Sequence, residues 1–211
     1  MNTIKDCFDI ILSSNENDSR LAARRVRKLL YSATASPDRS KHNEINNVIN
    51  NALDTYSKIQ EEWRQENFVM AASVIYWCHD KESQPDFLFP WFFQLLQHSN
   101  GYIRHAAVRM FSHEIWPLTV HIRIPGYKLS HFDKLTPEQA NKILHSLSAD
   151  LNKLLATLWQ PKYKRYKYID SLPVSPYKSV QMVLSELEES CEQEHSDRFT
   201  GRFSNDNIGI A

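Results

Sequence analysis

The chain has 211 residues, of which 42% are apolar and 24% charged, and its 25 basic residues balance 25 acidic ones, as in a soluble globular protein. Its four glycines form neither GxGxxG nor GxxxxGK[ST], and its three cysteines form no CxxC pair, which excludes a glycine-rich nucleotide site and a zinc finger. No apolar run approaches the roughly 20 residues of a membrane span, so we expect a cytoplasmic protein that avoids membranes and uses neither a metal nor a cofactor.

The first half of the chain predicts a series of amphipathic helices, because its apolar residues recur at steps of three and four. We expect these helices at residues 3–13, 18–35, 39–63 and 66–79. The segment 86–116 follows as two helices joined by a tight turn at Asn100-Gly101. We place this hairpin in the middle of the fold, because its first helix is too aromatic to stand without neighbours on both sides.

The pattern changes after Pro117, where apolar and polar residues alternate from Leu118 to Ile124. Alternation of this kind is the period of a β-strand, in which successive side chains point to opposite faces. We therefore expect an extended excursion over residues 118–135.

Two capped helices are predicted after this excursion. Thr136 is a helix cap, Pro137 suits the first helical position, and Gln139 completes a capping box, so a helix with a leucine stripe should run from there to about residue 158. Ser175-Pro176 repeats this start for a last helix. The polar tail at 193–211 is expected to be flexible.

Pairs of alanines recur along the first half of the chain, at Ala22-Ala23, Ala71-Ala72 and Ala106-Ala107, with separations of 49 and 35 residues. Each pair falls early in the second helix of a candidate hairpin, where small side chains let neighbouring helices approach closely when hairpins stack. The clearest motif is Ile103-Arg104-His105-Ala106-Ala107. It resembles the second helix of HEAT repeats, and the two separations bracket their period of roughly 40–47 residues.

The resemblance to HEAT-repeat, armadillo-like proteins covers about residues 3–116. It implies an all-α fold, a short right-handed α-solenoid of stacked antiparallel helix pairs, which we expect to form one domain over residues 1–192. It further implies a non-enzymatic adaptor or scaffold that binds a macromolecular partner, in first place a protein, on its concave surface. Ordinary helix packing without a true repeat is the alternative explanation of the alanine pairs.

Two groups of cations are candidate partner-binding residues. In residues 162–168 four cations alternate with three tyrosines, an arrangement in which the cations can meet phosphates and the rings can stack on bases. On the second helix, steps of four and three place arginines on one face, and a further arginine belongs to the HEAT-like motif. The candidates are Lys162, Lys164, Arg165, Lys167, Arg20, Arg24, Arg27 and Arg104. A surface loop with packed tyrosines and a solvated helix face are the alternative interpretations.

Nucleic-acid binding is the alternative function, and its enzymatic form would resemble the HEAT-like alkylpurine DNA glycosylases. Those enzymes grip DNA in a basic concave face and use tryptophans and an aspartate near the lesion, roles that would fall here to Trp77, Trp116 and Asp80. No motif supports this residue by residue, and the zero net charge argues against a dedicated DNA enzyme. His79-Asp80, at a helix end, predicts a capping pair rather than a catalytic dyad.

Overall fold

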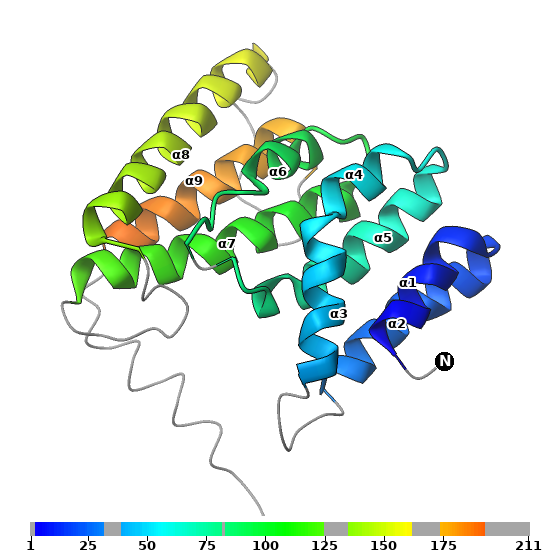
Figure 1. Ribbon diagram of the computed structural model, residues 1–211. Coiled ribbons are helices and arrows are strands. Elements are labelled where there is room, and N and C mark those ends of the chain that lie inside the picture. The colour runs from blue at the N-terminus through cyan, green and yellow to red at the C-terminus, as the bar shows by residue number, and fades with distance from the viewer. Residues whose placement is uncertain (1–2, 32–38, 82, 125–134, 162–173, 193–211) are drawn as a thin grey trace, which may run out of the picture.

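The computed structural model describes residues 3–31, 39–81, 83–124, 135–161 and 174–192, and within these ranges every regular element is a helix (Figure 1). The prediction of an all-α protein is therefore confirmed. The elements are α1 (Ile4–Ser13), α2 (Glu16–Tyr31), α3 (Arg39–Asn50), α4 (Ala52–Ser57), α5 (Glu62–Ile75), the short 3₁₀ helix η1 (Tyr76–Cys78), α6 (Phe89–Leu96), α7 (Gly101–Arg123), α8 (Pro137–Leu158) and α9 (Pro176–Glu192). None of the helices in the described ranges is both long and apolar enough to cross a bilayer.

Several helices begin where a side chain satisfies the unpaired backbone N–H groups of the first turn. The capping box predicted at Thr136 and Gln139 is present, and Thr3 begins α1 in the same way. The Asn100 side chain accepts hydrogen bonds from the backbone N–H groups of Tyr102 and Ile103, so the predicted turn leads directly into α7. Local chemistry thus determines these helix starts.

The single long helix predicted over residues 39–63 is wrong, because the chain breaks after Asn50 and again after Ser57. At the first break the Asn51 amide donates a hydrogen bond of 2.7 Å to the Asn47 carbonyl. Asparagine side chains compete in this way for backbone partners, which weakens a helix interior. The result is two shorter helices, α3 and α4, ahead of α5.

The extended excursion predicted from residue 118 is also wrong over the residues that the structure describes. The helix α7 continues through Pro117 to Arg123, while residues 125–134 lie outside the described part of the chain. Neighbouring helices α6, α8 and α9 pack against α7, so apolar residues are needed on several of its faces. Leu118 and Val120 are both fully buried, and their alternation with polar residues imitates the strand period inside a helix.

A row of helices organises the molecule. α2 packs against α5, α5 against α7, and α7 against α9; in Figure 1 α2 and α5 lie on the right, and α7 and α9 extend further left. The partners in the hairpins, α1, α6 and α8, pack against α2, α7 and α9 respectively. All three alanine pairs lie in helices of the row, and five of their six members are buried. Small side chains therefore stand where these helices approach one another.

The core is continuous from α1 to α9 and is densest in aromatic rings near its middle. Phe92 is fully buried, with its ring centroid 5.1 Å from that of Tyr76 and 5.2 Å from that of Phe111, in edge-to-face arrangements. Fully buried Trp91 packs beside it at 5.9 Å. The aromatic hairpin of α6 and α7 thus occupies the centre of the fold, as its sequence predicts.

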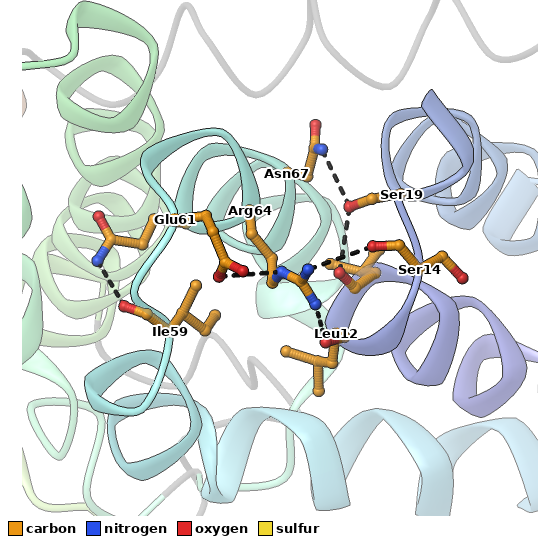
Figure 2. Close-up of polar contacts among 9 residues, drawn as sticks. Leu12, Ser14, Ser19, Ile59, Glu61, Arg64 and Asn67 are labelled. Carbon is orange, nitrogen blue, oxygen red and sulfur yellow. Dashed lines mark hydrogen bonds and ion pairs between the residues drawn. The ribbon is translucent and has the colours of Figure 1, made fainter. Parts of the chain in front are cut away.

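A partly buried arginine fixes α5 against the end of α1 (Figure 2). The Arg64 guanidinium donates hydrogen bonds to the backbone carbonyls of Leu12 and Ser14, and its Nε lies 3.3 Å from a carboxylate oxygen of Glu61. A cation at the C-terminal end of a helix satisfies carbonyls that have no partner within the helix. This contact holds the first hairpin, formed by α1 and α2, against α5.

A second polar link ties α2 to the same helix, as Figure 2 also shows. The Asn67 amide donates a hydrogen bond of 3.0 Å to the hydroxyl of Ser19, which in turn donates one of 3.1 Å to the carbonyl of Ile11. Ser19 and Asn67 are both buried, so each depends on this chain of bonds. This chain of hydrogen bonds links α2 directly to α5.

Candidate functional site

The faces of α2, α5 and α7 enclose a groove of about 740 Å³, which we call the inner groove. Its walls are α2 and α7, and its floor is α5. The lining residues are Arg20, Ala23, Arg24, Arg27 and Lys28 from α2, Glu66, Asn67, Met70 and Val74 from α5, and Tyr102 and Arg109 from α7.

The inner groove is strongly basic although the whole chain is neutral. Five cations line it, against the single carboxylate of Glu66. That carboxylate accepts a hydrogen bond of 2.6 Å from the Asn100 amide, so it already has a polar partner. In the described part of the chain no carboxylate lies within ion-pairing distance of Arg24, Lys28 or Arg109. The groove therefore presents a positive potential to its contents.

The cationic wall follows from the periodicity of α2. Arg20, Arg24 and Arg27 are spaced by four and three residues, so they project from one face of the helix. On the opposite face Ala22 and Val26 are fully buried, and this orients the arginines toward the groove. Asn15 directly precedes the helix, and its side-chain oxygen accepts the backbone N–H of Asp18 at 3.1 Å.

The opposite wall is built from residues two helical turns apart on α7. Tyr102 is 51% exposed, and Arg109 follows it by seven residues on the same face. His105 and His113 flank Arg109 by one turn on each side. Burial and then the positive charge of Arg109 lower the pKa of both imidazoles below its ordinary value of 6.5.

Acidification below about pH 6.5 is expected to destabilise the protein. The unfolded chain takes up protons on these histidines near pH 6.5, whereas the folded chain does so only at lower pH, because burial disfavours the imidazolium of His105, His113 and also His98. The unfolded state therefore binds more protons in this window, and the free energy of unfolding falls as the pH drops from 6.5 through the folded-state pKa values.

Urea unfolding at about pH 7.5 and about pH 5.5 measures this effect. The His113→Gln variant should show a weaker pH dependence than the wild type, whereas His145→Gln, at an exposed position of α8, should match the wild type. A free energy of unfolding that rises on acidification over this range would contradict the assignment.

The structure brings together the three α2 arginines that the sequence singled out, Arg20, Arg24 and Arg27. It adds Arg109 and Tyr102, which the sequence did not indicate because their helix is distant along the chain. The four cations Lys162, Lys164, Arg165 and Lys167 lie outside the described residues.

Arg104 has a different place from the other candidates. Its side chain is buried, at 5% exposure, and its Nη1 atom donates hydrogen bonds of 2.6 Å to the backbone carbonyls of His98 and Ser99. Those carbonyls follow the end of α6, so the guanidinium holds the turn of the central hairpin. Arg104 therefore stabilises the turn between α6 and α7, and it does not line the inner groove.

His79 pairs with Glu114 rather than with its neighbour Asp80. Its Nε2 atom lies 3.0 Å from a carboxylate oxygen of Glu114, and its Nδ1 atom accepts the backbone N–H of Lys81 at 3.0 Å. With Nδ1 acting as an acceptor, Nε2 is the ring nitrogen that donates to Glu114. The predicted helix-end position is confirmed, because His79 is the C-cap residue of η1 and its backbone N–H donates to the Tyr76 carbonyl. The backbone N–H of Asp80 donates to the side-chain oxygen of Asn46.

The His79–Glu114 pair is a packing element rather than an active site. The two side chains are only 8% and 6% exposed. The imidazole packs between the rings of Tyr76 and Phe87, with centroids 4.8 and 5.4 Å away. Burial and then the charge of Glu114 raise the pKa of the Tyr76 hydroxyl well above its usual range.

The residues of the glycosylase alternative do not line the inner groove. Trp77 is 48% exposed and Asp80 is exposed, while Trp116 is partly buried. Among the residues that the structure describes, no group of three or more histidines, cysteines and carboxylates is arranged to hold a metal ion.

No protein-family model, curated protein or solved structure matches this chain. The resemblance to HEAT repeats therefore rests on the residues of the motif alone. The inner groove is therefore the feature that bears on function, because a fold alone does not imply an activity.

Proposed function

We propose that this chain is a non-enzymatic helical-repeat protein, a short right-handed HEAT-like α-solenoid, that binds an anionic macromolecular partner in the inner groove. The observation that carries the proposal is that five cations from α2 and α7 line one groove that has a single carboxylate in its lining. Recognition would be stoichiometric, by a preformed curved surface of stacked helices. A protein with an acidic segment and a nucleic acid both satisfy this chemistry.

An extended partner suits the groove better than a small anion does. The cations of α2 extend from Arg20 to Lys28, a separation of eight residues or about 12 Å of helix. They do not converge on one point, as the ligands of a single phosphate or carboxylate would. The α2 cations are also exposed. Each single contact between an exposed cation and a partner is weak, so tight binding needs several contacts at once, which a long polyanion supplies.

A binding role is also favoured by what the lining contains. It includes one carboxylate and no histidine, cysteine or serine. Nucleophilic and acid–base catalysis both need a reactive group beside a second group that activates or orients it. The lining residues offer no such pair, so the groove is suited to hold a partner and not to transform it.

Reversing two charges of the inner groove tests the proposal. The variant Arg24→Glu/Lys28→Glu should bind polyanions at least about tenfold more weakly than the wild type, because two attractive contacts become repulsive. Binding is measured by fluorescence anisotropy at about 50 mM salt with two labelled probes, a polyglutamate peptide and a single-stranded oligonucleotide.

The matched control is Lys142→Glu/Lys153→Glu, which changes the net charge equally at two exposed positions of α8. It should bind within about twofold of the wild type, since screening limits the reach of distant surface charges. Equal losses in both variants would show that net charge and not the groove controls binding. Failure of the wild type to bind either probe would reject the proposed function. Circular dichroism confirms that each variant is folded.

A further inference from the structure

The two sides of the inner groove differ in chemistry. The α2 wall carries four of the five lining cations. The floor contributes Met70 and Val74 beside Glu66 and Asn67, and the α7 wall contributes Arg109 and Tyr102, whose side chain is 51% exposed. An occupant therefore meets most of the positive charge along the α2 edge, and apolar and aromatic surface with a single arginine toward the α7 edge.

We infer that the occupant is a single-stranded nucleic acid, an inference that rests on the proposed function of the inner groove. Such a strand has the complementary asymmetry, with phosphates along one edge and unpaired bases along the other. Grooves that bind single strands combine a cationic track for the backbone with an aromatic platform for a base. Here α2 is the track, Tyr102 is the platform, and the apolar floor receives the base edges.

The identity of the cations agrees with phosphate as the charged group. Four of the five lining cations are arginines. The planar guanidinium presents paired donors that match the oxygens of a phosphate, whereas lysine acts as a point charge. The α2 cations extend along about 12 Å, which corresponds to roughly three to four phosphates at the spacing of about 3.4 Å along a stacked strand.

Two other polyanions fit the groove less well. A duplex keeps its bases stacked inside, so neither Tyr102 nor Met70 could contact a base face, and only the cations would contribute. An acidic peptide carries its charges on flexible side chains and has no flat ring for Tyr102 to stack against. Both would use the cations and leave the aromatic wall without a role.

The test compares three labelled probes of equal charge by fluorescence anisotropy, namely an oligo-dT strand, a DNA duplex and a polyglutamate peptide. We expect the single strand to bind at least about tenfold more tightly than the other two. Neutralising one phosphate contact with Arg24→Gln should reduce the slope of log K against log salt by about 0.7.

Tyr102→Ala should weaken binding of the single strand by about tenfold, because one stacking contact is lost. Tyr102→Phe keeps a ring and should restore most of the affinity. The matched control is Trp159→Ala, since Trp159 is similarly exposed, at 46%, but lies at the end of α8 and outside the lining. It should leave binding unchanged.

The outcomes separate this inference from the proposed function. If the peptide or the duplex binds as tightly as the single strand, or if Tyr102→Ala has no effect, the inference is overturned while groove binding stands. If the Arg24→Glu/Lys28→Glu variant binds every probe as well as the wild type, or if no probe binds, the proposed function fails and the inference fails with it.

Discussion

Replacing His79 with alanine is expected to lower the free energy of unfolding by about 3–5 kcal/mol. The substitution removes the donor that lies 3.0 Å from the Glu114 carboxylate and leaves that carboxylate, only 6% exposed, without its partner. A buried charge that loses its partner retains the cost of desolvation, and it gains nothing in return. The imidazole also fills the space between Tyr76 and Phe87, so a cavity adds to the loss.

A double-mutant cycle in urea measures this contribution. Glu114→Gln keeps an oxygen that can accept the Nε2 proton while removing the charge, so we expect it to cost less than His79→Ala. The double variant His79→Ala/Glu114→Gln should be more stable than His79→Ala alone, since its buried carboxylate is gone. A loss below about 1 kcal/mol for His79→Ala would show that the pair is not structural.

The second large effect is expected for Arg104→Ala, which should lower the free energy of unfolding by about 2–4 kcal/mol. Two backbone carbonyls at the turn between α6 and α7 lose their charged donor, and the buried space of the side chain is vacated. Burial lowers the pKa of this guanidinium, which reflects how far it is removed from water.

The functional readout distinguishes a structural arginine from one of the groove. Arg104→Ala should bind the anionic probes as the wild type does under conditions where both are folded, whereas Arg24→Glu/Lys28→Glu should lose binding and keep most of its stability. Arg104→Lys retains one charged donor and should fall between the wild type and Arg104→Ala in urea unfolding. If Arg104→Ala weakened binding without loss of stability, Arg104 would belong to the site after all.

The helical class and several helix starts could be predicted because their causes are local. Thr136 with Gln139 and Asn100 before α7 satisfy backbone groups within a few residues, and the structure confirms both. The cationic face of α2 was equally accessible, since Arg20, Arg24 and Arg27 share a face in any helix. Local periodicity failed at Pro117, where burial by several neighbouring helices produced an apolar alternation that imitates a strand.

The division of roles between two arginines of one helix could not be predicted. Arg104 and Arg109 are five residues apart, which rotates them by about 140° around α7. One therefore faces the turn after α6 and the other faces the inner groove. The motif at residues 103–107 shows only that an arginine is present, because the surroundings of each face depend on which helices pack there.

Local sequence therefore accounts for the all-α class, the capped helix starts and the cationic wall of α2. Tertiary structure alone joins that wall to Met70 on α5 and to Tyr102 and Arg109 on α7, and pairs His79 with Glu114 across 35 residues. The physical reason is that local periodicity shows which face of a helix is apolar or charged, but not which other helix packs beside it. The inner groove exists only where three helices from separate parts of the chain pack side by side.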